Sequence, residues 1–239
     1  MNTYEQTAPP PLPAVPRTIG IGWILLGAVL GVVVVPAVLG GIVLVAAGDA
    51  ESDGALLATQ AIFAAGLVAV PVFLLRILHV EPVADRLGIR KFRFWSGIGW
   101  MFAAYGLFFV FAFLYGLVIQ TDSEQQVLQD IAAETDTAIL VVQGILVIVF
   151  APISEEIFFR GFLFGGLRSR LTFWPAALIP GLFFGSLHLL GGSWEVVPPL
   201  AAFGVLLAWL YERTGSLGPP MLMHALQNAI AFAITAAGV

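Results

Sequence analysis

Apolar residues fill long, nearly uninterrupted stretches of this chain, and short polar segments separate them. A helix needs about 20 mainly apolar residues to cross a hydrocarbon core of about 30 Å. Seven stretches come close to this length or exceed it. They are residues 19–47, 56–78, 94–119, 138–167, 173–190, 196–211 and 217–237. The pattern therefore predicts an all-α fold, a polytopic membrane bundle of about seven transmembrane helices.

The composition supports a lipid-facing surface. Hydrophobic residues make up 59% of the chain and charged residues 10%, whereas soluble domains carry about 25% charged residues. We expect an integral, multi-pass membrane protein, in the cell membrane if the source is prokaryotic, with the lipid bilayer as its main partner. No basic stripe indicates nucleic acid. The chain has no cysteine, which excludes disulfides and thiolate nucleophiles.

The charges of the connecting loops alternate along the chain. Basic residues occupy one set of loops, at Arg17, 86–93, 168–170 and Arg213. Acidic residues occupy the other set, at 49–53, 122–136 and Glu195. By the positive-inside rule, this alternation predicts a cytoplasmic N-terminus and an external C-terminus.

Three regions follow from this layout. Residues 1–17 form a proline-rich cytoplasmic tail that we expect to be disordered. Residues 18–136 hold the N-terminal spans and an external acidic loop, in which a capping box at Ser123–Gln126 predicts a short helix at 124–133. Residues 137–239 hold the remaining spans and most of the polar side chains that are expected inside the membrane.

Two glutamates and an arginine lie inside the fourth apolar stretch. Each charge costs roughly 2.5 to 3.5 kcal/mol near the middle of a bilayer, so such groups are usually functional. Glu156 and Arg160 are four residues apart and are expected to pair on one helix face, whereas Glu155 should face a neighbouring helix. Pro152 should open the helix and free a backbone carbonyl. An ion pair beside a protonated glutamic acid that only joins helices is the alternative.

Further polar residues lie in the last spans. His188 stands in the fifth span, and His224 and Asn228 share one face of the seventh. A single histidine in a membrane is often only a hydrogen bond between helices. Because the first three spans carry almost no such groups, we expect the histidines, Glu155 and Asn228 to converge in one cavity.

A carboxylate and an imidazole can activate water, while a second imidazole and a carboxamide can stabilise an oxyanion. These residues are therefore typical of a hydrolase. The His-Glu-x-x-His motif of zinc proteases is absent, and Ser186 lacks the Gly-x-Ser-x-Gly frame of a serine nucleophile. A transporter that uses Glu155 and the histidines as a proton relay is the main alternative, and a catalytically silent membrane scaffold is a third.

Three motifs resemble the CAAX-protease and bacteriocin-processing family of intramembrane endopeptidases, which includes the Ras-converting CAAX prenyl endopeptidases. They are Glu155-Glu156-x-x-x-Arg160, Phe184-x-x-x-His188 and His224-x-x-x-Asn228. The resemblance implies that residues 137–239 are the catalytic membrane helices. It also implies that Glu155 and His188 activate water and that His224 and Asn228 stabilise the oxyanion. Glu156, Arg160 and Phe184 would then be supporting residues.

The resemblance leaves the cofactor and the substrate open. The family is commonly labelled as metalloproteases, so zinc is an alternative, but we favour a mechanism without a cofactor because asparagine is an unusual zinc ligand. The implied substrate is a peptide or protein at the membrane. The family includes enzymes for prenylated CAAX tails, for peptide maturation and for bacteriocin self-immunity, and nothing in the sequence selects among them.

Overall fold

The structure, a computed structural model, describes residues 19–50, 52–80, 82–119 and 131–237. All regular structure in these residues is helical. The expected tail at 1–17 and most of the expected short helix at 124–133 lie outside the described residues.

The N-terminal region forms three long helices. The first comprises α1 (Ile21–Val29), two π-helical segments at Leu30–Val34 and Pro36–Gly40, and α2 (Gly41–Ala47). It is followed by α3 (Asp53–Ile77), the short α4 (Val83–Arg86) and α5 (Phe94–Val118). These helices lie within three residues of the expected bounds at nearly every end.

The C-terminal region forms four more passes. The elements of its first pass are α7 (Thr137–Ile145), a π-helical segment at Leu146–Phe150, α8 (Ala151–Glu155), a second π-helical segment at Glu156–Phe164, and α9 (Gly165–Arg168). After it come α10 (Phe173–Leu187), 3-10 turns at His188–Gly191 and Trp194–Val196, α11 (Val197–Thr214) and α12 (Gly218–Ala236). The fifth span was expected to reach residue 190. Its α-helix ends at Leu187, because the chain tightens into a 3-10 turn before Gly191 and Gly192.

The described residues therefore form one helical pass at each of the seven predicted apolar stretches. Among the described residues, five helices are long and apolar enough to cross a membrane: residues 21–47, 53–77, 94–118, 137–168 and 194–214. The helix α10 is apolar but shorter. Many large hydrophobic side chains on these helices are exposed, including Val45 at 84% and Trp95 at 83%. A surface of this kind is suited to lipid.

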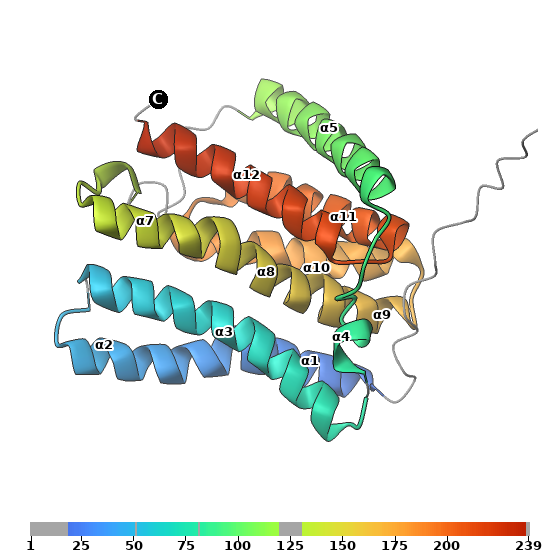
Figure 1. The fold of residues 1–239 in the computed structure, drawn as a ribbon, viewed down its shortest axis with the longest axis horizontal. Helices are drawn as coiled ribbons and strands as arrows, with labels where there is room; N and C mark the ends of the chain where they lie inside the picture. Colours follow the sequence, from blue (N-terminus) through green and yellow to red (C-terminus); the bar gives the residue numbers. More distant parts are fainter. Residues whose placement is uncertain (1–18, 51, 81, 120–130, 238–239) are drawn as a thin grey trace, which may run out of the picture.

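The passes run back and forth between two ends of the bundle (Figure 1). The long helix of residues 137–168 is central, with α3 on one side and α12 on the other (Figure 1). The loop between α2 and α3, which carries acidic residues, lies at one end, and α4, α9 and the turn between α11 and α12 lie at the other (Figure 1). The basic loops and this acidic loop thus lie at opposite ends of the bundle, as the alternation predicted.

Polar contacts join the loops at the basic end. Arg168 forms an ion pair with Glu212 at 2.9 Å, which connects α9 to α11. The Ser216 hydroxyl donates to the carbonyl oxygen of Arg90 at 2.6 Å, and Leu217 N–H donates to Gly88 O at 2.9 Å. The loop after α4 is therefore attached to the turn that precedes α12. This contact joins the N-terminal spans to the helix that carries His224.

Close helix packing positions the remaining site element, α10. A Cβ atom added at Gly185 would lie 2.7 Å from Val197 O, and one added at Gly204 would lie 3.0 Å from the Cα of Gly181. Small residues let the backbones of α10 and α11 approach this closely, as is typical of helices packed in membranes.

Candidate active site

The central helix changes its hydrogen-bonding register just before the two glutamates. Ala151 N–H donates to Leu146 O, five residues back, which is the π-helical pattern. The next N–H in this register would come from residue 152 and reach Val147 O, but residue 152 is proline and has no N–H. The Asn228 side-chain amide donates to Val147 O at 2.8 Å. The sequence predicted a carbonyl freed by Pro152, and the structure identifies a partner for it.

Regular α-helix and π-helical segments follow one another without a break from Thr137 to Arg168. The wider π turns next to Pro152 accommodate it, because proline has no N–H with which to form the usual i to i−4 hydrogen bond.

Glu156 and Arg160 form the predicted buried pair. The Arg160 guanidinium donates to Glu156 Oε1 at 2.8 Å, and the two side chains are 2% and 0% exposed. Arg160 also donates to Gly204 O at 3.1 Å and stacks over the ring of Phe184 at 4.9 Å. A charged group held by this many contacts is fixed in place, and it ties the central helix to α10 and α11.

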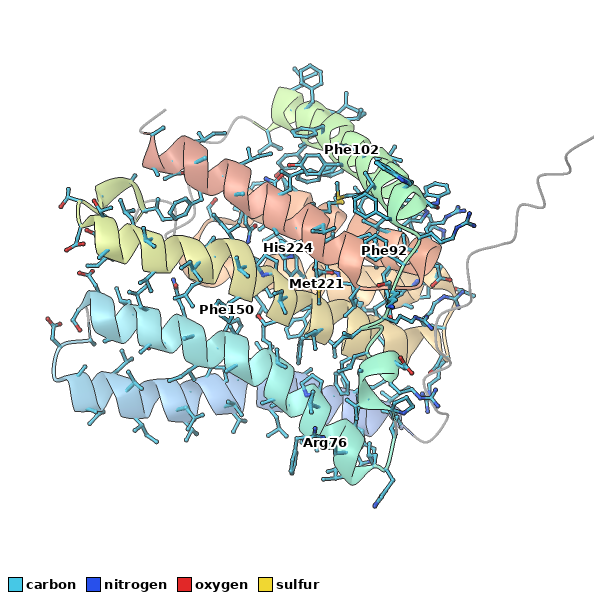
Figure 2. The ribbon with its side chains drawn as sticks, viewed as in Figure 1. Arg76, Phe92, Phe102, Phe150, Met221 and His224 are labelled. Atoms are coloured by element: carbon cyan, nitrogen blue, oxygen red, sulfur yellow. The ribbon has the colours of Figure 1, made fainter. Side chains whose placement is uncertain are left out.

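His224 lies between the two carboxylates. Its Nδ1–H donates to Glu156 Oε1 at 2.9 Å, and its Nε2 lies 3.6 Å from Glu155 Oε2. Figure 2 places His224 between α12 and the central helix, in the interior of the bundle. The sequence predicted that Glu155 and Glu156 point in different directions. They do reach different ring nitrogens, yet one imidazole contacts both.

His188 lies at the end of α10. Its Nδ1–H donates to Phe184 O at 3.0 Å, and its ring makes an edge contact with the Phe184 ring at 5.1 Å between centroids. The ring of Phe184 also contacts that of His224, at 5.7 Å. Phe184 therefore contacts both imidazoles. Each Nδ1 is occupied by a local partner, so each Nε2 is the nitrogen left for chemistry.

One pocket brings the predicted residues together. Glu155, His188, His224 and Asn228 all line a cavity of about 270 Å³, together with Phe184. Its other walls are mainly apolar, with Phe63, Phe108 and Phe203 among them. Glu155 is 17% exposed, so its carboxylate is accessible from this space, whereas Glu156 is fully buried. Among the described residues, Glu155 and His188 make no direct hydrogen bond to each other, and the cavity lies between them.

Some residues of this pocket were not anticipated. Gln60 of α3 lines it, although the first three spans were expected to contribute almost nothing polar. Gln227 of α12 lines it as well, and its Oε1 accepts a hydrogen bond from the Tyr105 hydroxyl of α5 at 2.8 Å. The available signal was a single amide in an otherwise apolar second span, which is unusual enough inside a membrane to suggest a role.

Comparison with known proteins agrees with these motifs. Residues 137–230 match the family described as Type II CAAX prenyl endopeptidase Rce1-like, and this range contains all three motifs. Residues 137–230 thus carry a domain like that of the CAAX-protease family. No solved structure matches the chain.

Relatives with curated descriptions include members named as proteases. YdiL of Bacillus subtilis (strain 168), whose name assigns it to the membrane peptidases, is 27% identical over 76% of this chain and 75% of its own length. MroQ of Staphylococcus aureus (strain USA300), named a membrane-embedded CAAX protease, is 25% identical over 55% of each chain. An uncharacterised 24.3 kDa protein of Escherichia coli is 27% identical over 54% of this chain and 59% of its own. The chain thus spans little more than half the length of two of these three relatives.

The resemblance to the CAAX-protease family raises the question whether side chains of this pocket could hold zinc. Among the described residues, no three His, Cys, Asp or Glu side chains are grouped closely enough to hold a metal ion. The Nδ1 atoms of His188 and His224 are taken by Phe184 O and Glu156. The Asn228 amide is directed to Val147 O. Within the described residues the donors of this pocket are therefore not grouped as a zinc site, and the Nε2 atoms of the two histidines are the atoms that a metal could use.

Proposed function

We propose that this protein is an intramembrane endopeptidase that hydrolyses peptide bonds of a membrane-associated substrate. The observation that carries the proposal is the pocket, in which one accessible carboxylate and two imidazoles from three different passes meet inside a lipid-facing bundle. Resemblance to the CAAX-protease family supports the reaction class.

Glu155 acts as the general base in this proposal. A water molecule between Glu155 and His188 loses a proton to the carboxylate as its oxygen attacks the substrate carbonyl carbon. The proton then moves to the amide nitrogen as the carbon–nitrogen bond breaks. The wider exposure of Glu155 suits this role, because a base must reach both water and substrate. Glu156, which is buried, cannot reach them without rearrangement.

His224 and Asn228 stabilise the oxyanion. Since His224 Nδ1–H donates to Glu156, a protonated His224 presents its Nε2–H towards the pocket. The Asn228 amide group uses one N–H for Val147 O and keeps a second. Preorganised donors of this kind stabilise the charge that develops during acyl transfer. Glu156 and Arg160 support the site by holding His224 and the central helix in place.

The proposed substrate is a peptide or protein segment at the membrane. The apolar walls of the pocket favour apolar side chains next to the scissile bond. Lipidated and unlipidated peptides are both candidate substrates, and the test below compares them.

The test compares the wild-type protein with Glu155→Gln. Both are purified in detergent and incubated with a mixture of synthetic peptides of 8 to 12 residues, with and without a farnesyl group, and products are identified by mass spectrometry. Cleavage by the wild type alone is the expected result. Glu155-dependent proton flux in liposomes without cleavage of any peptide would instead support the proton relay and overturn the proposal.

A further inference from the structure

Gln60 of α3 is a polar residue of the pocket with unused hydrogen-bonding capacity. It comes from the N-terminal spans, outside the matched range of residues 137–230. Its Oε1 atom is buried and accepts no hydrogen bond from any residue that the structure describes. A buried acceptor without a partner is unfavourable, and a ligand that supplies the missing donor is one way to satisfy it. The surrounding chain is apolar, with Phe63 and Ala64 lining the pocket one turn further along.

A second amide in the same pocket is oriented by a residue of another N-terminal span. The Tyr105 hydroxyl donates to Gln227 Oε1 at 2.8 Å, so the amide oxygen is occupied and the two N–H groups of Gln227 remain as donors. Gln60 thus offers an acceptor and Gln227 offers donors within one cavity of about 270 Å³. Neither side chain can take up or release a proton, so neither serves as the base or acid of hydrolysis.

An acceptor and a donor in one pocket match the two polar groups of a peptide unit. We propose that Gln60 is a substrate-positioning residue whose Oε1 accepts a hydrogen bond from a backbone N–H of the peptide, while Gln227, held by Tyr105, donates to a backbone carbonyl. This inference rests on the proposed function. It assigns to the N-terminal spans the task of orienting the peptide main chain, independent of side-chain sequence, against Glu155.

The experiment uses a peptide that the wild-type protein cleaves, taken from the synthetic mixture described above. Its kinetics are measured for wild type, Gln60→Leu and Gln60→Asn. Losing one neutral hydrogen bond should lower kcat/KM about 3- to 10-fold. Gln60→Asn, which keeps an amide oxygen on a shorter side chain, should recover part of the loss. Thr59→Val is the matched control, because the Thr59 hydroxyl donates to Ala55 O of its own helix. That variant should behave like the wild type.

Ester-substituted peptides supply a readout that a purely structural role would not change. Each amide N–H outside the scissile bond is replaced in turn by an ester oxygen, which removes the donor. For the wild type, one such replacement should lower kcat/KM as much as Gln60→Leu does. In Gln60→Leu the same replacement should cost nothing further, because the bond is already lost.

Three results would overturn the inference. Equal kcat/KM for wild type and Gln60→Leu would do so, and so would ester effects that are the same size in both proteins. A Gln60→Leu protein with a lowered melting temperature and unchanged ester effects would show a structural role instead. A wild-type protein that cleaves none of the peptides would contradict the proposed function itself. That result differs from the three above, in which the wild type does cleave a peptide.

Discussion

Glu155 and Glu156 are adjacent in sequence but have different surroundings. The Glu155 side chain is 17% exposed and borders the pocket. Glu156 is fully buried and serves both Arg160 and His224 through one oxygen, while its other oxygen is buried without a partner among the described residues. One carboxylate can reach a substrate and the other holds the site together. Substitution should therefore affect them differently.

We predict that Glu155→Gln abolishes hydrolysis and leaves the melting temperature in detergent close to that of the wild type. Glu156→Gln should lower it clearly, because Arg160 loses its counter-charge in a buried position at a cost of about 3 to 5 kcal/mol. Glu212→Gln is the matched control, since its pair with Arg168 is partly exposed and should contribute less than about 1 kcal/mol. Equal melting temperatures for Glu155→Gln and Glu156→Gln would contradict this division of roles.

The same residues decide the question of metal. If Glu155 and His188 prepare the water without a cofactor, protein treated with a strong chelator should keep cleaving its peptide, and elemental analysis should find well under one zinc per chain. His224→Ala should lower kcat about 10²- to 10³-fold, as expected for loss of one oxyanion donor, with no change in metal content.

Stoichiometric zinc that disappears in the His188→Ala and His224→Ala variants would reject this mechanism. So would cleavage that stops on chelation and returns with added zinc, which would show that the metal lowers the pKa of its bound water. Either result would place the metal on the Nε2 atoms, because the Nδ1–H groups donate to Phe184 O and Glu156. The assignment to an endopeptidase would be unaffected.

At the scale of single elements, the central helix couples its backbone to Asn228. Pro152 cannot donate to Val147 O in the π-helical register, and the Asn228 amide donates to it instead. Asn228→Ala should therefore leave a partly buried carbonyl without this partner and destabilise the protein by about 1 kcal/mol. Pro152→Ala should restore an N–H at this position and make Asn228 less important for stability.

The measurement is a double-mutant cycle on thermal stability in detergent. The loss caused by Asn228→Ala should be clearly smaller when Pro152→Ala is also present. Peptidase activity should remain low in both proteins that lack Asn228, because its remaining N–H is the proposed oxyanion donor. Additive effects on stability would show that the Pro152 register and the Asn228 contact are independent.

The elements also show what the sequence could predict. Hydrophobic run lengths predicted seven helices within a few residues of their observed bounds, because burying backbone groups in lipid requires helices. The spacing of Glu156 and Arg160 predicted their pair, which is a local property of one helix. The position of His224 between both glutamates depends on how α12 packs against the central helix, and periodicity in one chain segment contains no such information.

Gln60 illustrates the same limit across the molecule. Its sequence neighbours are apolar, and no motif includes it, so only the packing of α3 against the central helix shows that it lines the pocket. Tyr105 likewise reaches Gln227 from a helix that is more than 100 residues away in sequence. Sequence motifs identify ionisable residues such as glutamate and histidine. Neutral residues that complete a site can be identified only from the packing of the helices.

At the scale of the whole molecule, the separation of basic and acidic loops predicts how the bundle is oriented in the membrane. The segment between α4 and α5, which contains Lys91 and Arg93, begins at the end that holds α4, α9 and the turn before α12, while the loop between α2 and α3, which contains Asp49, lies at the opposite end (Figure 1). Cytoplasmic loops are enriched in Lys and Arg, so the end with α4 should face the cytoplasm. The start of α1 lies at this end as well (Figure 1).

Single cysteines test this orientation directly, because the chain contains no cysteine of its own. Lys91→Cys and Gly54→Cys place one thiol at each end, and both positions are exposed. A Cβ atom at Gly54 meets nothing within 4 Å, so this substitution should not disturb the fold. In intact cells, a membrane-impermeant maleimide should label residue 54, and residue 91 only after the membrane is opened. Labelling of residue 91 from outside, with residue 54 protected, would invert the topology and place both the basic loops and the end of the bundle near Arg168 outside the cell.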